Sequence, residues 1–426
     1  MDRKKKVLIV GGAASGVITA IALQHFGVAP EQIDIAEVRN LLGEGLAYQT
    51  RDPLHRLNVP TARMSAIEAL PNDFVEWSAA VGYSFMERQN YGFYLRERLG
   101  SEITHIQEYV INLEQQSNGE ILATFAHGSV QNYEVVVLAM GHGKARIPDF
   151  LNSTEESPRI IGDVWSGSEL PQSTNLLCFG TGLSFIDVAM THLSRNPANQ
   201  VIAVSGSGNL PERHTPSAIT PFAPTLEEVS TLTKLREYLA KAGDSWREAI
   251  DGLRPITEPM WRGFSAVERE EFLRADGSSW SRRRHRIAPD VAEQVEREIQ
   301  AGRLMVIKGK VSAVSVENDL VTLRLIDGES YSGEYLAVTI GREYESSDPL
   351  SLNLLRDEKT NRGPLGMGLS VDVSTGLLLN SKGDPYSQIY AIGPLRSGEA
   401  FESTAIPEIR KQASLIAKRV SSQILS

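Results

Sequence analysis

A short apolar run, a glycine-rich turn and a helix-like stretch follow one another twice in this chain, and this pattern constrains its fold more than any other feature. The first copy is VLIVGGAASGVITAIAL. It opens with Val7–Val10, a continuous apolar run typical of a strand buried on both faces of a parallel sheet. Gly11 and Gly12 allow a tight turn. Gly16 would let the next helix, expected over Ser15–Phe26, pack close to the strand. The N-terminus of such a helix offers N–H groups to a pyrophosphate.

The segment that follows, QIDIAEVRN, predicts a second strand ending in Glu37. An acid about 20 residues past the glycines is placed to accept a hydrogen bond from a ribose hydroxyl. Ala13 stands where such a fingerprint has its middle glycine, which lets the backbone approach the pyrophosphate. One extra methyl group is tolerable if the pyrophosphate lies slightly farther from the backbone of the turn.

The same opening residues also resemble a secretory signal peptide, because three lysines at positions 4–6 precede a mostly apolar run. Glycines in the middle of that run would weaken the helix of a signal peptide. The complete order of strand, turn, helix, strand and acid favours the dinucleotide-binding unit. We therefore expect a cytoplasmic protein.

The second copy, TNLLCFGTGLSFIDVAM, predicts a strand over 176–179, a turn at Gly180 and Gly182, and a helix over 183–193. Phe185 occupies the third glycine position. The next strand ends in Ser-Gly-Ser at 205–207. It carries neither an acid for a free ribose nor an arginine for a 2′-phosphate, so NADPH and NADH both stay open.

Two such folds suggest that the chain binds two dinucleotides. The simplest pair is an FAD that stays bound and an NADPH or NADH that binds, delivers hydride and dissociates. A duplicated fold that binds one ligand is the alternative. The length of 426 residues fits two or three domains. We expect an α/β protein with two Rossmann-like domains: a discontinuous FAD domain (1–165 and 336–426) and an inserted NAD(P)H domain (166–335) that carries a helical insertion (211–300).

Composition excludes several other classes of protein. The net charge of −10 argues against a nucleic-acid partner, and no stretch after residue 23 is apolar enough to cross a membrane. The single cysteine, Cys178, lies within a predicted strand, which favours a small buried hydrophobe. The histidines show no metal-ligand spacing, so we expect no metal. Sequence motifs of serine hydrolases, zinc peptidases and P-loop proteins do not occur.

The expected insertion ends in the basic run SRRRHR. Arg284 and Arg286 are candidates for holding an anion, either a cofactor phosphate or a substrate carboxylate. A solvated basic turn paired with the acidic run at 268–271 is the alternative. His285 is a candidate proton shuttle, because histidine is the side chain that ordinarily changes charge near neutral pH.

Several blocks resemble a bacterial family of FAD/NAD(P)-binding monooxygenases. The family includes the FAD-dependent urate hydroxylase and the flavin-dependent enzyme that oxidises aspartate to nitrosuccinate. The early blocks are GEGLAYQTRDPLHRLNVPTARMSAI, NDFVEW and RQNYGFYLRERL, and the later ones are GTGLSFID, GDSWREAIDGLRP, RRHRIAP and TAIPEIRKQA. The resemblance spans almost the whole chain and is specific for the family but not for the substrate.

This resemblance implies a flavin fingerprint and a second nucleotide fingerprint at the glycine turns found above. The chain departs from the pattern at Gly206, where many relatives have arginine, at Met140, where threonine is usual, and in IGRE, which lacks the usual Cys-Thr-Gly. The residues expected at FAD are Gly11, Gly12, Ala13, Ser15, Gly16, Glu37, Val110, Gly141 and Gly393, and those expected at NAD(P)H are Gly180, Gly182, Leu183, Ser184 and Arg213.

The resemblance also implies an activity. NAD(P)H and O₂ would be used to oxygenate a small polar substrate that contains nitrogen, by amino-acid N-oxidation or urate-type hydroxylation. An FAD-dependent oxidase or dehydrogenase is the first alternative, and a non-catalytic nucleotide-binding protein is the second. The small-molecule substrate and O₂ are the expected partners, and a homodimer stays open. Candidates for the boundary between flavin and substrate are Asn58, Arg63, Glu402 and Thr404, and His285 is the candidate proton shuttle named above.

Overall fold

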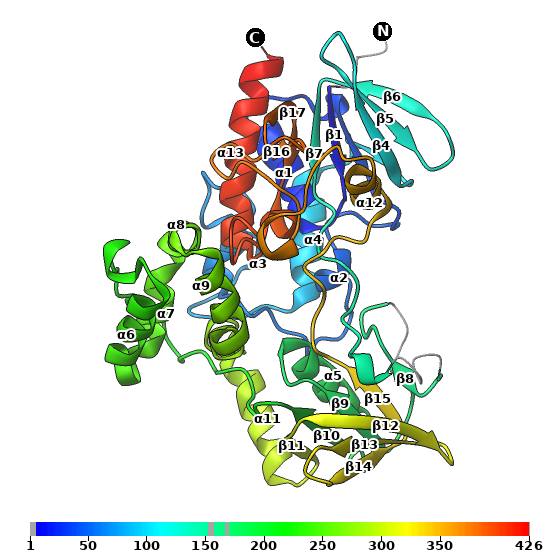
Figure 1. Cartoon of the computed structure of the whole chain (residues 1–426), viewed down its shortest axis with the longest axis vertical. Coiled ribbons are helices and arrows are strands. Elements are labelled where there is room, and N and C mark those ends of the chain that lie inside the picture. The colour runs from blue at the N-terminus through cyan, green and yellow to red at the C-terminus, as the bar shows by residue number, and fades with distance from the viewer. Residues whose placement is uncertain (1–5, 152–156, 167–169, 426) are drawn as a thin grey trace.

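The structure is a computed structural model that describes residues 6–151, 157–166 and 170–425. It contains two mainly parallel sheets, one in the upper and one in the lower half of Figure 1. From edge to edge, the first sheet consists of β16 (Leu377–Leu379), β17 (Pro385–Ala391), β7 (Val135–Leu138), β1 (Val7–Val10), β2 (Ile33–Ala36) and β3 (Thr104–Ile106). Neighbouring strands run parallel except the edge pair β16 and β17.

The second sheet has the same central arrangement, with its glycine-bearing strand flanked by parallel neighbours. From edge to edge it consists of β11 (Leu304–Lys308), β10 (Gln200–Ser205), β9 (Asn175–Phe179), β15 (Tyr335–Val338) and β8 (Ile160–Ile161). Two antiparallel sheets complete the strands: β4 (Val110–Gln115), β5 (Ile121–Phe125) and β6 (Val130–Tyr133), then β12 (Val311–Glu317), β13 (Leu320–Leu325) and β14 (Ser330–Gly333).

Each antiparallel sheet leads directly into the parallel strand beside the glycine-bearing one, β7 in the first half and β15 in the second. The two halves therefore repeat one plan. This repetition confirms the expected α/β fold with two Rossmann-like units.

The helices, with the single π-helical turn of the described residues, have the following bounds. They are α1 (Ala14–His25), α2 (Gly45–Tyr48), α3 (Asp73–Ser78), α4 (Arg88–Leu99), α5 (Leu183–Arg195), α6 (Leu232–Ala242), α7 (Trp246–Leu253), α8 (Thr257–Gly263), α9 (Ala266–Glu271), the π-helical turn η7 (Phe272–Asp276), α10 (Gly277–Arg284), α11 (Pro289–Gln300), α12 (Pro349–Arg356) and α13 (Ile406–Ile424).

Burial explains why β1 is apolar at every position. Val7 and Ile9 belong to a core shared with α1, α4 and α13, whereas Leu8 and Val10 belong to a core shared with the antiparallel sheet β4–β6 and α12. Successive side chains of a strand point to opposite faces, so a strand covered on both faces has no polar side.

The boundaries of the second unit differ from the expected ones. Its sheet includes β8, which precedes residue 166, and β15, which ends after residue 335. Helix α11 contributes Val291 and Val295 to the core beneath β9 and β10. It therefore belongs to the second Rossmann-like unit rather than to the insertion expected over 211–300.

Helices α6–α10 form a separate group with its own core, beside the two sheet-containing halves in Figure 1. Trp261 and Trp280 are central to this core, and Phe401 from the C-terminal segment packs into it. The Trp261 Nε1–H donates to the Gly398 carbonyl at 2.9 Å. The insertion is thus docked on the segment that leads into α13. Within the described residues, no helix is long and apolar enough to span a membrane.

Candidate dinucleotide and substrate site

A cavity of about 760 Å³ opens at the carboxyl ends of β1, β2 and β7 and extends to the first turn of α5. Ligands of open α/β sheets bind at this edge, where the strand order reverses. Much of its wall comes from segments that the sequence singled out. The predicted site residues that line it are Gly11, Ala13, Ser15, Glu37, Asn58, Val110, Gly141, Leu183, Ser184 and Thr404.

The turn at Gly11 requires glycine for two reasons. Its φ is +101°, a conformation that side chains with a Cβ rarely adopt, and an added Cβ would collide with the carbonyl of Ala139 at the end of β7. Gly16 is required for packing, because its Cβ would collide with the Gly11 carbonyl. Gly11 thus forms the tight turn and Gly16 brings the helix close to it, the two roles that the sequence predicts.

Ala13 is accommodated without strain. It precedes α1 with φ −76° and ψ −167°, an extended conformation open to any residue. Its methyl group faces Gly45, where an added Cβ would lie 2.6 Å from the Ala13 Cβ. A glycine opposite the turn therefore gives the alanine its space.

The start of α1 fits a dinucleotide pyrophosphate. The first bond of the helix runs from the Val17 N–H to the Ala13 carbonyl, so the N–H groups of Ala14, Ser15 and Gly16 precede the hydrogen-bonded ladder. Such groups, together with the helix dipole, favour an anion. Gly393, with φ +70°, lies so close that its Cβ would be 2.8 Å from the Ser15 Oγ.

Glu37 is buried at the end of β2, where it lines the cavity. Its Oε2 accepts from the Gly12 N–H at 3.0 Å, and its Oε1 accepts from the Arg39 N–H, also at 3.0 Å. These bonds fix the carboxylate beside the turn. A carboxylate has further acceptor sites, so it can still accept from a ribose hydroxyl.

The second turn repeats the geometry of the first. Gly180 has φ +108° and abuts the Thr339 carbonyl, as Gly11 abuts that of Ala139. Gly182 precedes α5 with φ −80° and ψ −166°, nearly the values of Ala13. Phe185, at the position of Gly16, is fully buried in the core of the second unit.

The end of β10 is neutral, as its sequence indicates. The Thr181 hydroxyl donates to the Ser205 Oγ at 2.9 Å, and Ser205 also accepts from the Gly208 N–H at 3.1 Å. Arg213 does not line the cavity. It is more than half exposed and faces Glu296 at 3.5 Å.

Asn58 and Thr404 also line the cavity, and Thr404 comes two residues before the start of α13. The Asn58 carbonyl accepts from the Nε2 of His214 at 3.1 Å, so the other ring nitrogen accepts from the Tyr83 hydroxyl at 3.4 Å. Burial, and then the charge of Arg286, lowers the pKa of His214 to about 4. Neutral His214 therefore holds the backbone at Asn58.

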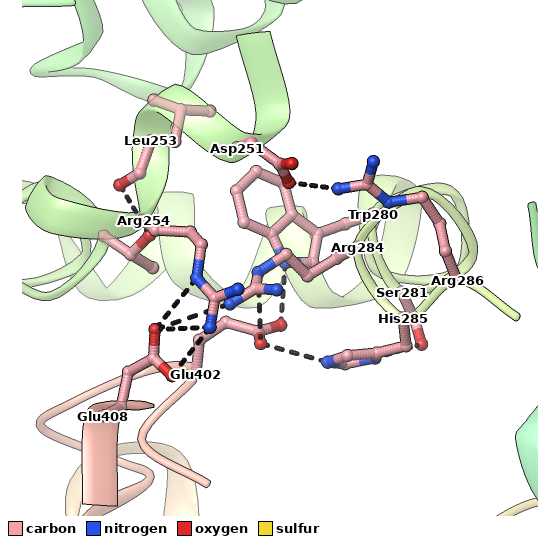
Figure 2. A network of polar contacts seen from close by, with 11 residues as sticks. Asp251, Leu253, Arg254, Trp280, Ser281, Arg284, His285, Arg286, Glu402 and Glu408 are labelled. Carbon is pink, nitrogen blue, oxygen red and sulfur yellow. Dashed lines mark hydrogen bonds and ion pairs between the residues drawn. The ribbon is translucent and has the colours of Figure 1, made fainter. Parts of the chain in front are cut away.

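Glu402 lies outside the cavity wall and joins the insertion to the C-terminal segment (Figure 2). It accepts from the Trp280 Nε1–H at 2.9 Å and pairs with the His285 Nε2 at 3.1 Å. Burial alone would raise the pKa of Glu402, but the His285 and Arg284 charges and the Trp280 bond hold it well below its usual range. Its φ of +63° is unusual for a side chain with a Cβ.

The predicted arginines differ in their partners. Arg286 is buried and bonded to Asp251, whereas Arg254, absent from the predictions, is held by both oxygens of Glu408 at 3.0 Å. Arg284 is buried with carboxylate oxygens no nearer than 3.7 Å, and its Nε has no hydrogen-bond partner among the described residues. Figure 2 shows its guanidinium between Glu402 and Glu408.

Arg63 also lies outside the cavity wall. It is half-buried, and its positive charge contributes to lowering the pKa values of His214 and Arg254. Burial, followed by the charge of Arg284, is the main cause that lowers the pKa of Arg254 to about 10. The region around Arg284 is therefore rich in positive charge.

Several cavity residues were missed because no motif marks them. Arg88, the first residue of α4, pairs with Asp187 of α5 at 2.8 Å and thereby joins the two Rossmann-like units. Arg342 donates to the Gly143 carbonyl at 2.8 Å and pairs with Asp163 at 2.9 Å, which ties the segment after β15 to the segments after β7 and β8. In the sequence, glycines mark the neighbourhood of Arg342, but no motif marks Arg88 or Arg342 itself.

Within the described residues, no group of three histidine, cysteine or carboxylate side chains could hold a metal. Cys178 is fully buried in β9, and burial raises the pKa of its thiol. The thiol is thus kept in its unreactive protonated form.

Comparison with known proteins gives three kinds of result. A family model described as FAD-NAD(P)-binding matches residues 8–143. No curated protein matches the chain. The solved structures that resemble it include the ornithine hydroxylase of Pseudomonas aeruginosa, with a TM-score of 0.67 and 15% identity over 99% of this chain and 100% of that one.

Two further structures cover the chain as fully. The cadaverine monooxygenase of desferrioxamine biosynthesis from Erwinia amylovora, solved with FAD bound, has a TM-score of 0.68 and 10% identity over 99% of this chain and 95% of that one. The bacillithiol disulfide reductase of Staphylococcus aureus has a TM-score of 0.60 and 14% identity over 99% of both chains. The chain therefore has, over nearly its whole length, the two-unit dinucleotide-binding fold that these oxidoreductases share.

Proposed function

We propose that this chain is an FAD-dependent monooxygenase that uses NADPH or NADH and O₂ to oxygenate a small polar substrate containing nitrogen. The observation that carries the proposal is one continuous cavity. It is lined by the FAD-type turn at Gly11, by the first turn of α5 at Leu183 and Ser184, and by Thr404 beside the docked insertion. The flavin, the nicotinamide and a substrate would meet in this space.

The reaction balances without a protein nucleophile. NAD(P)H supplies two electrons, one oxygen atom enters the substrate, and the other leaves as water after taking up two protons. FAD, when bound, supplies the acceptor for hydride and the means of activating O₂. The protein is left to bind, to orient and to exclude water.

The residues fit these tasks. The N–H groups at the start of α1 would hold the FAD pyrophosphate, and Glu37 would accept from its ribose. Asn58, fixed through His214, and Thr404 would border the flavin ring. The insertion, docked by Trp261 and Glu402, would cover the substrate.

Arg284 is not a lining residue of the cavity, but its unfilled donor capacity supports a substrate whose carboxylate reaches it. A buried guanidinium with unfilled donor capacity is costly unless an anion completes it. Its Nε lacks a hydrogen-bond partner in the described structure, and its nearest carboxylates are already engaged by His285 and Arg254. An amino acid would offer both this carboxylate and a nitrogen, in line with the ornithine substrate named for one similar structure.

For the reductant we propose NADPH over NADH. The end of β10 lacks the acid that would accept from a free ribose hydroxyl. Lys308, the last residue of the neighbouring strand β11, lies against Gly208 just past β10 and is exposed. Its ammonium group would pair with the 2′-phosphate of NADPH.

A Lys308→Glu variant should raise the KM for NADPH about tenfold or more and leave the KM for NADH within about twofold.

Disulfide reduction, named for another similar structure, is disfavoured for this chain. Its single thiol, Cys178, is buried in β9 with a raised pKa, so the chain holds no thiol pair to pass electrons to a disulfide.

Turnover under ¹⁸O₂ tests the proposal. FAD-loaded protein, NADPH and a panel of amino acids, amines and urate should give a product with one labelled oxygen atom. Arg284→Gln should raise the KM for a carboxylate-bearing substrate about tenfold or more, whereas Arg274→Gln, at an exposed position of the insertion, should not. Turnover that yields unlabelled product and peroxide would identify an oxidase instead.

A further inference from the structure

A second cavity, of about 350 Å³, lies inside the helical insertion and shares no lining residue with the first. Most of its lining comes from four elements, α6, α7, the π-helical turn η7 and α10. Its apolar lining consists of Leu232, Leu235, Leu239, Ala240, Ile250, Phe272 and Trp280, and its charged lining consists of Arg236, Asp276 and Arg283.

The charges of this lining do not balance. Arg236 is satisfied, because it pairs with Asp276 at 2.7 Å and with Glu271 at 2.8 Å. Arg283 has no carboxylate within 4.0 Å among the described residues and rests on the ring of Trp246 at 5.6 Å. The lining therefore has one cation available for an anion at the edge of an apolar space.

The wall has a second unusual feature. The chain runs from α9 into α10 through a π-helical turn, Phe272–Asp276, which contributes two lining residues. Such turns are rare and occur often at functional sites. The turn sets Asp276 against Arg236 and Phe272 against Trp280, so it shapes both the polar and the apolar part of the cavity.

We infer that this cavity is a binding site for a small amphiphilic monoanion, a monocarboxylate whose apolar body lies among the leucines and Trp280 and whose carboxylate pairs with Arg283. The single negative charge of the ligand matches the one available cation, Arg283, and the apolar chain of the ligand matches the apolar wall of the cavity. The site does not depend on the proposed oxygenation, because no residue of the dinucleotide cavity takes part. Trp280, which lines this cavity, also donates to Glu402 of the C-terminal segment, at the junction that docks the insertion.

Calorimetric titration of the FAD-loaded full chain with octanoate tests the inference. One octanoate should bind per chain, and 1-octanol, which lacks the charge, should bind at least about tenfold more weakly. Arg283→Ala should weaken octanoate binding by a similar factor. Ala240→Trp, which fills the cavity from an exposed rim position, should abolish it.

Arg274→Ala is the matched control, because Arg274 lies on the same insertion, is exposed and does not line the cavity. Its octanoate affinity should equal that of the unaltered protein. Three outcomes would each overturn the inference. They are no octanoate binding by the unaltered protein, Arg283 and Ala240 variants that bind octanoate as tightly as the unaltered protein, and an Arg274 variant weakened as much as the Arg283 variant. Arg283→Ala removes a partly buried side chain that makes no ion pair among the described residues, so the test does not depend on the fold of the filled variant.

Discussion

At the scale of single residues, the two turns show why one glycine position is strict and another is free. Gly11 and Gly180 combine a left-handed φ with contact to a neighbouring strand's carbonyl. Ala13 and Gly182 are extended, so the methyl group of Ala13 needs only room, which Gly45 provides. The sequence indicates which positions carry glycine, but only backbone angles separate the required from the replaceable.

This difference gives the first prediction. Gly11→Val should reduce FAD binding at least about a hundredfold or prevent folding, because strain and collision add at one site. Ala13→Gly should leave FAD affinity within about threefold. Flavin absorbance retained after gel filtration measures both. Full flavin content in a folded Gly11→Val protein would contradict the placement of the pyrophosphate on this turn.

His214 gives a prediction for pH. Its pKa falls to about 4 in the folded protein, chiefly through burial, from 6.5 in the unfolded chain. The unfolded chain therefore binds more protons between these values, and stability falls as the pH drops from 6.5 to about 4, by at most about 3 kcal/mol. Urea unfolding across this range should show a smaller loss for His214→Gln. Parallel curves for the two proteins would exclude His214 as the cause.

At the scale of elements, the insertion is held by few but well-buried contacts. Trp280 and His285 of the α10 segment meet Glu402, and Trp261 of α8 meets the Gly398 carbonyl. The sequence suggests that His285 and Glu402 are catalytic residues, whereas in the structure they join the end of α10 to the segment before α13. Their pairing is not readable from sequence, because more than a hundred residues separate them and no periodic pattern links them.

Glu402→Gln should loosen this junction, because it removes the charge that attracts His285 and Arg284. A loss of about 1–3 kcal/mol of local stability is expected. Hydrogen exchange should accelerate in α10 but not in β1. Glu271→Gln, which alters an exposed pair within the insertion, serves as the control. Unchanged exchange in α10 would mean that the other contacts, made by Trp261, Phe401 and the Arg254–Glu408 pair, are enough to hold the insertion.

At the scale of the whole molecule, the two Rossmann-like units are joined by ionic contacts across the cavity. Arg88 and Asp187 form such a pair, and their side chains are 14% and 7% exposed. The repeated strand–turn–helix signal predicted the two units and their order. It could not predict this junction or the place of α11, because both depend on which surfaces meet after each unit has folded.

Breaking the Arg88–Asp187 pair on one side should cost about 3–5 kcal/mol, since an uncompensated buried charge remains. The double change Arg88→Met with Asp187→Leu should recover most of that loss. Denaturant unfolding of the two single variants and the double variant measures the coupling. The more exposed pair Arg159–Asp319, treated in the same way, should show about 1 kcal/mol or less. Additive losses at positions 88 and 187 would show that the pair is not coupled.

The burial of Cys178 has a practical consequence. A thiol enclosed in β9 and kept protonated reacts slowly with maleimides and iodoacetamides, so the natural chain behaves as if it lacked cysteine in labelling experiments. A cysteine placed at Ser278 of α10, which is exposed and lines neither cavity, could therefore be modified selectively with a fluorophore or a spin label. Motion of the insertion could then be followed in the otherwise unaltered protein.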